Sequence, residues 1–354
     1  MNAPLLHAPL AVRAADLRDV HEVARWDAFV AAHPGATPFH TPAWCLAVAE
    51  GCRQRAHLLV AERADGRIAG LLPLTEVHSP LFGRALVSTG FAVDGGILAD
   101  QPNAVSALAH EMAALAERLS CPTLELRGGT DPGQGWHEDT HSYLGFARDL
   151  AADNEAELKA IPRKQRAEVR RSLDNGLTVE VGADRATHHA IYAESVRNLG
   201  TPVFPASLFA CVLDHFGEQA DILTIRKDGQ PVASVLSLYW RGTVYPYWGG
   251  GTHAARGLRA NDLMYYALMN HARRRGCTRF DFGRSKAGTG AAAFKKNWGF
   301  DGRPLAYWKR TTDGRPAREI NPLNPKYRLQ VAAWQRLPLG LATRLGPMIA
   351  RGLG

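Results

Sequence analysis

The same order of predicted elements occurs twice along this chain, and this repetition constrains the fold more than any other feature of the sequence. Asp65-Gly66 lies between two apolar runs in the first half, and Asp228-Gly229 lies between two such runs in the second half. Each pair predicts a β-hairpin, because glycine readily adopts the positive φ angles of a tight turn. In both halves, helices are expected before the hairpin, and a strand, a helix and a final strand after it. We infer an internal structural repeat.

The repeat predicts an α/β (α+β) fold with two similar domains, each built on a mixed central sheet flanked by helices. The boundary is expected near residues 149–154. We therefore expect an N-terminal domain over residues 1–152, a C-terminal domain over 153–315, and a basic, apolar tail over 316–354. The length of 354 residues agrees with two domains.

Charge and cysteine content narrow the possible partners. The net charge is +8 and the pI is about 9.4. These values favour a nucleic acid, a phosphorylated or nucleotide-linked substrate, or an anionic membrane surface as partner, although they also fit a moderately basic soluble enzyme. The five cysteines are scattered along the chain, so we expect neither a metal site nor a disulfide framework. Reduced cytosolic thiols are the better interpretation.

Targeting signals are not evident in the sequence. The first residues, Met1 to His7, do not combine a basic region with a long apolar core, as a signal peptide would. No run reaches the 18 or so apolar residues that a membrane span needs. We expect a cytoplasmic protein that is soluble, or peripheral at the inner face of the membrane.

The segment Phe280–Phe300 is the richest candidate site. Five charged side chains fall within sixteen of its residues, namely Asp281, Arg284, Lys286, Lys295 and Lys296. The pattern predicts a strand, then a polar, glycine-rich loop that includes Ser285, then a short turn that presents the two lysines between aromatic residues. Such a mixture suits a site that holds an anionic donor and stabilises an oxyanion. A solvated basic loop is the alternative, but Phe294, Trp298 and Phe300 would hold the lysine stems against an apolar wall.

A second candidate is the strand end at residues 245–251. It contains Tyr247 and Trp248, followed by the consecutive glycines Gly249, Gly250 and Gly251. Glycines at a strand end allow the backbone to approach a ligand closely. Arg259 and Asn261 then lie at the start of a predicted helix, where backbone amides can bind an anion. The alternative is that the glycines form only a bulge and a loop.

Two further basic segments could meet an anionic partner. Residues 155–175 are expected to form a helix in which Arg163, Arg166 and Arg170 share one face. This face could contact a nucleic acid or a phosphorylated carrier, or it could simply be solvated.

The tail after Glu319 has no acidic residue and mixes basic side chains with tryptophan and leucine. This composition suits an interfacial helix on an anionic membrane, and packing of the tail on the second domain is the alternative. Pro338 and Pro347 are expected to break any long helix.

Taken together, these motifs resemble those of the FemAB-like acyltransferases, whose catalytic domain has the GNAT (acyl-CoA N-acyltransferase-like) fold. The resemblance covers nearly the whole chain from Val23 onward. The motifs that carry it are Asp281-Phe282-Gly283, Phe294-Lys295, Trp298-Gly299-Phe300, Tyr247-Trp248-Gly249-Gly250, Asn261-Asp262-Leu263, and, in the first half, the segments Pro38–Trp44 and Leu71–Leu74. The segments Phe282–Lys286 and Asn324–Arg328 are similar to the branch associated with exosortase and PEP-CTERM exopolysaccharide loci.

The resemblance implies two tandem GNAT-like domains with the active cleft between them. Members that act on peptidoglycan precursors move an aminoacyl group from aminoacyl-tRNA to a peptide amine, and Lys295 occupies the position of their transition-state lysine. The stretch Arg256–Ala260 is a degenerate version of the acyl-CoA signature. The resemblance therefore leaves two possible donors, acyl-CoA and aminoacyl-tRNA, and implies no tightly bound cofactor.

Our first hypothesis is an acyltransferase or aminoacyltransferase acting on an amine of a cell-envelope, peptidoglycan or exopolysaccharide precursor. Lys295 would stabilise the oxyanion, and Asp281 would orient Lys286 or the amine, with general-base catalysis as a weaker possibility. Arg284 and Lys286 would hold phosphates, and His40 of the first domain would contact the acceptor. The second hypothesis is a non-enzymatic basic scaffold that binds a nucleic acid or an anionic polymer during export.

Overall fold

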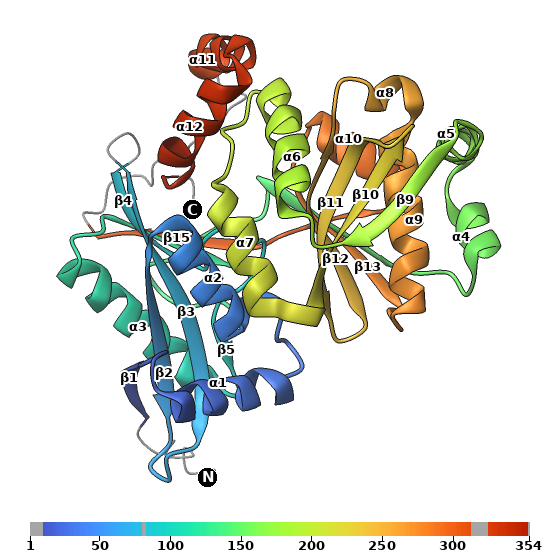
Figure 1. The fold of residues 1–354 in the computed structure, drawn as a ribbon. Coiled ribbons are helices and arrows are strands. Elements are labelled where there is room, and N and C mark those ends of the chain that lie inside the picture. The colour runs from blue at the N-terminus through green and yellow to red at the C-terminus, as the bar shows by residue number, and fades with distance from the viewer. Residues whose placement is uncertain (1–9, 80–82, 313–324, 353–354) are drawn as a thin grey trace. The chain divides into compact units, whose positions relative to one another are not determined.

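A computed structural model describes residues 10–79, 83–312 and 325–352, with side chains described from residue 329 onward in the last segment (Figure 1). The chain forms two compact units. Unit 1 comprises residues 1–140, 306–319 and 351–354, and unit 2 comprises residues 141–305 and 320–350. Residues 1–7, on which the expectation about a signal peptide rests, lie outside the described residues, and so does Asn324 of the tail motif.

Unit 1 is built on a mixed sheet with strand order β1-β2-β3-β4-β6-β15-β7, to which β5 adds beside β3. Its strands are β1 (Ala11–Ala15), β2 (Arg55–Glu62), β3 (Ile68–Ser79), β4 (Gly83–Ser88), β5 (Leu98–Ala99), β6 (Thr123–Arg127), β7 (His137–Asp139) and β15 (Tyr307–Thr311). Its helices are α1 (Val20–Ala32), the 3-10 turn η1 (Pro38–His40), α2 (Pro42–Cys52) and α3 (Pro102–Arg118). The buried face of α3 packs on the sheet through residues such as Leu108 and Met112.

Unit 2 is built on a second mixed sheet with strand order β14-β8-β13-β12-β11-β10-β9. Its strands are β8 (Tyr143–Asp149), β9 (Leu177–Gly182), β10 (Ala220–Lys227), β11 (Gln230–Trp240), β12 (Thr243–Gly251), β13 (Arg279–Lys286) and β14 (Gly302–Pro304). Its helices are α4 (Asn154–Ala160), α5 (Arg163–Asp174), α6 (Arg185–Leu199), α7 (Ala206–Phe216), η2 (Gly217–Gln219), α8 (Ala255–Leu258), α9 (Ala260–Arg274), α10 (Gly290–Asn297), α11 (Pro325–Arg336) and α12 (Leu339–Ala350).

The predicted repeat is present in both sheets. Strands β2 and β3 pair antiparallel across Asp65-Gly66, and β10 and β11 pair antiparallel across Asp228-Gly229. In each unit the next strand extends the hairpin, a helix crosses over, and the following strand lies parallel to it. These parallel pairs are β4 with β6 after α3, and β12 with β13 after α9. The sequence-based expectation of mixed sheets flanked by helices is confirmed.

The structure divides the chain differently from the boundaries expected from the repeated order of elements. Strand β8, which precedes residue 152, lies in the sheet of unit 2 beside β13, and β15 pairs with β6 and β7 in unit 1. Each unit thus includes a strand from beyond the expected boundary. The order of predicted elements cannot reveal such exchanges, because the sequence of a short strand does not specify which other strand completes its hydrogen bonds.

Three local expectations need correction. The turn expected before Trp298 is a helix, α10, whose first turn is capped by the Thr289 hydroxyl. The basic helix expected over 155–175 is interrupted at Pro162, because proline lacks an N–H and disfavours helical backbone in the preceding residue. Pro347 lies inside α12 and does not end it.

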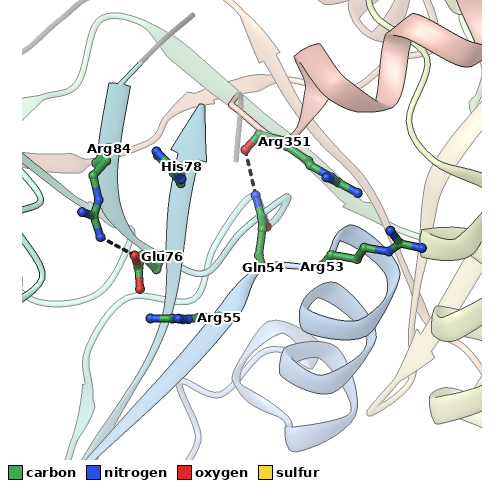
Figure 2. A pocket seen from close by; sticks show the side chains of 7 residues that line it. All are labelled: Arg53, Gln54, Arg55, Glu76, His78, Arg84 and Arg351. Atoms are coloured by element: carbon green, nitrogen blue, oxygen red, sulfur yellow. Dashed lines mark hydrogen bonds and ion pairs between the residues drawn. The ribbon is translucent and has the colours of Figure 1, made fainter. Parts of the chain in front are cut away.

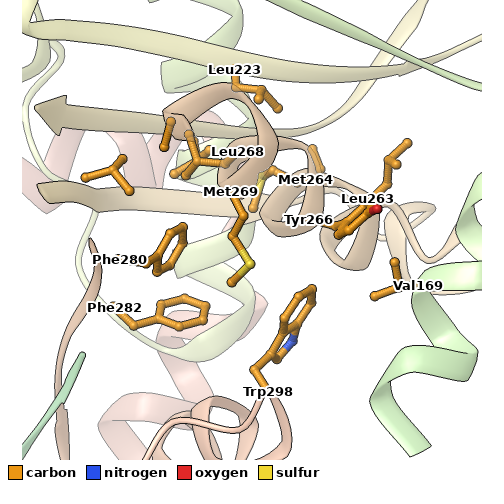
Figure 3. Close-up of a cluster of buried hydrophobic side chains, with 14 of the residues drawn as sticks. Val169, Leu223, Leu263, Met264, Tyr266, Leu268, Met269, Phe280, Phe282 and Trp298 are labelled. Carbon is orange, nitrogen blue, oxygen red and sulfur yellow. The ribbon is translucent and has the colours of Figure 1, made fainter. Parts of the chain in front are cut away.

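The two faces of the unit 2 sheet are covered by different helices. Ser234 of β11 contacts His188 of α6, while the neighbouring Ala233 and Val235 belong to a cluster with α9. Because successive strand residues point to opposite faces, α6 and α9 lie on opposite sides of the sheet. Figure 3 shows Met269 extending from α9 toward Phe282 and Trp298. This core fixes α9 and α10 relative to β13.

Gly250 is required for close packing of α6 on β12, so we expect Gly250→Ala to destabilise unit 2. A Cβ at this position would lie 2.3 Å from Ser195 Oγ and 2.5 Å from Ser195 Cβ. Relieving that clash requires a shift of α6, at a cost of about 1–3 kcal/mol in the free energy of unfolding.

Gly257→Ala is the matched control, because a Cβ there meets nothing within 4 Å. Urea unfolding of both variants measures the difference. Equal stability of the two variants would contradict the packing argument.

Candidate active site

The parallel strands β12 and β13 separate soon after they meet. They pair over only two residue pairs, Thr243 with Arg279 and Val244 with Phe280. Beyond this point β12 continues along β11 to Gly251, while β13 continues along β8 to Lys286. No further pair joins β12 to β13 in the described part of the chain, so their facing edges diverge.

A β-bulge in each strand accompanies this separation. In β12, Trp248 lies opposite Leu236 and Pro246 opposite Ser237, which leaves Tyr247 as the extra residue. In β13, Asp281 lies opposite Ala147 and Arg284 opposite Gly145, so one extra residue is again accommodated. Bulges bend a strand and increase its twist, and they are common beside active sites.

The bulge of β13 depends on Asp281 and Gly283. Gly283 has a φ of +67°, a conformation that favours glycine, and its N–H donates a 2.8 Å hydrogen bond to Asp281 Oδ1. Burial raises the pKa of Asp281, opposed by this hydrogen bond and by the nearby charge of Lys295. Asp281 therefore shapes the strand beside Lys295, in addition to any role toward a substrate.

Lys295 reaches from α10 back to β13 beside the divergence. Its Nζ donates a 2.8 Å hydrogen bond to the Arg284 carbonyl and lies 5.4 Å from the ring centre of Phe146 and 5.5 Å from that of Phe282. Burial lowers its pKa to about 7, while the charge of Asp281 acts in the opposite direction. The structure thus holds an amine near the midpoint of its titration at neutral pH.

The other predicted residues of this segment differ in their exposure. Arg284 is partly buried, with its guanidinium 4.7 Å from the ring centre of Tyr143, and Lys286 is also partly buried. Ser285 is buried, because alternation along β13 directs it to the other face. Phe294 packs edge-on to the aromatic cluster, and Lys296 is exposed.

The glycine-rich end of β12 is explained largely by packing. Val235 lies against Gly249, Ser195 against Gly250, and Ala255 with Asn261 against Gly251, each too close for an added Cβ to fit without a shift. Trp248 is 6% exposed and packs edge-on against Phe209 of α7. These contacts agree with the alternative that treated the glycines as a bulge and a loop.

The start of α9 is less suited to an anion than its sequence predicts. Arg259 forms a 2.7 Å ion pair with Glu168 of α5, so part of its charge is compensated. Asp262 accepts a hydrogen bond from Gln165, and burial raises its pKa. Asn261 places a buried Oδ1 near Gly251, and this atom has no hydrogen-bond partner among the described residues.

His40 has the geometry of a structural histidine. It lies in unit 1, is 3% exposed, and uses both ring nitrogens, Nδ1 with Thr37 and Nε2 with the Gly96 carbonyl. Burial lowers its pKa to about 4, so it is neutral at physiological pH. The fully buried Trp44 likewise donates from Nε1 to the Gly90 carbonyl. These contacts leave His40 no ring nitrogen for an acceptor substrate.

Sequence reasoning missed the residues of β8 that complete the site. Phe146 forms one wall of the Lys295 environment, and Tyr143 lies under Arg284. The alternation of Leu144 and Phe146 with small or polar residues was a signal for a strand there. Its proximity to the expected domain boundary concealed it.

Within the described residues, no group of three or more His, Cys, Asp or Glu side chains is arranged to hold a metal ion. None of the helices described has the length and apolar character needed to cross a bilayer.

Comparison with known proteins agrees with this geometry. Residues 163–296, from α5 to α10, match the family model described as an acetyltransferase (GNAT) domain. No curated protein sequence matches the chain.

Several solved structures share the fold of nearly the whole chain. FemX matches with a TM-score of 0.64 at 17% identity, covering 82% of this chain and 96% of its own. A tandem GNAT protein from the clavulanic acid biosynthesis pathway matches at 0.56 and 15% identity, covering 86% and 98%. L-PGS from Bacillus licheniformis matches at 0.53 and 16% identity, covering 90% and 98%. Identities this low support the fold alone. Residues 163–296 therefore match a GNAT acetyltransferase domain, and they lie within a tandem GNAT-like fold.

Proposed function

We propose that this protein transfers an acyl or aminoacyl group to an amine of a cell-envelope, peptidoglycan or exopolysaccharide precursor. The observation that carries the proposal is the divergence of β12 from β13 beside Lys295. A strand edge that leaves its parallel neighbour beside a partly buried, titratable amine offers both a place to bind an extended donor and a group to stabilise the charge that develops on its carbonyl.

The donor would lie along the β12 edge that faces β13. Residues 249–251, the glycine end of β12, make no ladder pair with β13 among the described residues, so an extended donor with amide groups can pair there as an added strand would. The GNAT domain match favours acyl-CoA as this donor. Aminoacyl-tRNA is the second candidate, and the exposed Arg163, Lys164 and Arg170 of α5 would favour its binding.

The reaction is a nucleophilic substitution at the donor carbonyl. The acceptor amine forms a C–N bond to the carbonyl carbon, and the tetrahedral intermediate carries a negative oxygen. Its collapse breaks the C–S bond of a thioester, or the C–O bond of an aminoacyl ester. The amine releases a proton, and the leaving group takes one up. Positioning both substrates supplies much of the rate, because it makes the attack effectively intramolecular.

Lys295 would stabilise the negative oxygen in its ammonium form. The Arg284 carbonyl accepts one of the three Nζ hydrogens and fixes the direction of the others. The rings of Phe146 and Phe282 limit the access of water, which strengthens the electrostatic interaction. Arg284 and Lys286 would hold phosphates of a carrier-linked substrate, and Lys296 would extend this positive surface.

The acceptor class rests on the FemAB-like motifs and on the fold shared with FemX. A precursor attached to a phosphorylated carrier would suit the positive charge of β13 and α10. The similarity of Phe282–Lys286 to the exopolysaccharide-associated branch favours an exopolysaccharide precursor among such acceptors. Measuring activity with a panel of acceptors tests this preference.

We also propose that the protein contacts anionic membranes through α12. This helix docks on unit 2 through Ala342 and Gly346, the latter packed against the Val203 backbone. Its opposite face exposes Leu341, Leu345 and Met348, which are 47%, 43% and 66% exposed. Arg344 of the same helix is exposed, as is Arg336 at the end of α11, so apolar insertion and attraction to anionic lipid would act together.

We expect Lys295→Met to reduce turnover by roughly 100-fold or more, because it removes the oxyanion-stabilising cation while preserving side-chain volume. Lys295→Arg should retain more activity than Lys295→Met. Purified protein is given acetyl-CoA, or aminoacyl-tRNA in a second arm, with a panel of amino-sugar and peptide amines, and release of the donor's leaving group is measured.

Lys159→Met, on the exposed surface of α4, is the control and should keep normal turnover. Near-normal turnover of a folded Lys295→Met enzyme would eliminate the assigned role.

We expect the Lys295 amine to titrate near pH 7, and Asp281→Asn to lower its pKa further by removing the carboxylate that favours the ammonium form. Reductive methylation with carbon-13 followed by NMR measures both values without a substrate. Because the ammonium form is lost as pH rises, Lys295-dependent turnover should fall through the same range. A resonance that titrates near pH 10 would refute the buried environment.

We expect Leu345→Asp to weaken binding to phosphatidylglycerol vesicles by about tenfold or more, since a buried leucine contributes about 1.5–3 kcal/mol. Co-sedimentation at two salt concentrations measures binding, and phosphatidylcholine vesicles should bind poorly. Val20→Asp, at an exposed apolar residue of unit 1, is the control. Failure of the unaltered protein to bind phosphatidylglycerol vesicles would exclude the membrane contact.

A further inference from the structure

Unit 1 contains a strongly basic pocket that lies outside the GNAT-matched residues. Its volume is about 350 Å³. Figure 2 shows the walls, which come from the end of α2, the start of β2, the end of β3, the start of β4 and residue 351. The volume falls within the range of small-molecule sites, so the pocket can hold a compact ligand.

Positive charge dominates the walls. Four arginines line the pocket, namely Arg53, Arg55, Arg84 and Arg351, together with one carboxylate, Glu76. Burial opposes ionisation of Glu76, but hydrogen bonds from Arg84 and His57 outweigh it and lower its pKa, so the carboxylate is charged. The Glu76 carboxylate forms an ion pair with Arg84, with 2.7 Å between Oε1 and Nη2. In the described part of the chain, no acidic side chain pairs with the other three arginines.

The backbone at Arg53 adds an independent observation. Arg53 ends α2 with a φ of +52° and ψ of +47°, a left-handed conformation in which glycine is the usual residue. An arginine is disfavoured there, so its presence at the pocket wall calls for a compensating role. A cation that contacts a ligand supplies one.

The walls also retain unused hydrogen-bonding capacity. Gln54 donates from Nε2 to the Arg351 carbonyl at 2.8 Å, which links two of the residues that line the pocket. Gln54 Oε1, Arg84 Nε and Arg351 Nε are buried without a hydrogen-bond partner among the described residues. The protein by itself thus leaves these polar atoms without hydrogen bonds. Small shifts of the side chains would bring the atoms within reach of a bound ligand or its ordered water.

We propose that this pocket binds a ligand that carries phosphoryl groups. Arginine forks match phosphate oxygens in pairs, and three arginines that pair with no described acidic side chain can neutralise a diphosphate. A neutral or cationic ligand would leave that charge uncompensated. The proposal does not depend on acyl transfer, since every wall residue lies outside 163–296.

Arg53→Gly provides a sharp test, because it removes the cation and relieves the left-handed strain at once. We expect the melting temperature to stay the same or rise, while the affinity for inorganic pyrophosphate falls at least tenfold. Arg55→Gln, a second removal of charge on β2, should weaken binding similarly. Isothermal titration calorimetry with inorganic pyrophosphate and with ADP measures affinity, with adenosine as the uncharged control ligand. Arg18→Gln, whose side chain is 91% exposed and lies outside the pocket, is the matched control.

Vesicles distinguish a lipid headgroup from a free phosphorylated molecule. The vesicle test compares the double variant with Leu345→Asp alone, so that the contribution of α12 is already removed. If Arg53→Gly abolishes the remaining binding to phosphatidylglycerol vesicles, and soluble pyrophosphate does not bind, the phosphoryl group belongs to a lipid headgroup. Saturable pyrophosphate or ADP binding that Arg53→Gly weakens would identify a soluble ligand. The proposal is overturned if neither probe binds, or if Arg18→Gln weakens binding as much as Arg53→Gly.

Discussion

The separation of β12 from β13 after two residue pairs is the constraint on which the proposed active site depends. If the two parallel strands stayed hydrogen-bonded along their whole length, their facing backbone groups would be satisfied by each other and no edge would remain for a donor. The bulges at Tyr247 and Gly283 bend both strands just past the last pair, and Asp281 holds the second bulge through the Gly283 N–H. The aromatic core around Met269 fixes the positions of α9 and α10 relative to β13. The separation of β12 from β13 is therefore supported by the packed interior.

Lys295 shows how the same core serves chemistry. Burial beside Phe146 and Phe282 penalises the ammonium, and Asp281 opposes that penalty only in part. The result is an amine whose charge is sensitive to pH in the neutral range. Such an arrangement reduces stability relative to an apolar side chain, and this is a common feature of residues kept for function rather than for folding.

Much of the fold was predictable because its signals are local. Asp65-Gly66 and Asp228-Gly229 specify tight turns, and the apolar runs around them specify strands, so the repeated hairpin-strand-helix-strand order could be inferred directly. The segment around Lys295 was also identifiable, since charged residues among aromatics rarely serve a core strand. His40 was misleading for a physical reason. A histidine in a polar, proline-rich turn can be a ligand or a buried capping residue, and only its contacts with Thr37 and Gly96 distinguish the two.

What the sequence determined by itself was the order of elements, the turn positions and the chemical character of the Phe280–Phe300 segment. Tertiary structure alone decided that β8 supplies Phe146, that Arg259 is paired with Glu168, and that arginines from α2, β2 and β4 surround one pocket. The physical reason is the range of the interactions. Turn and helix preferences act over a few neighbouring residues, whereas burial, ion pairing and pKa values depend on groups brought together from distant parts of the chain.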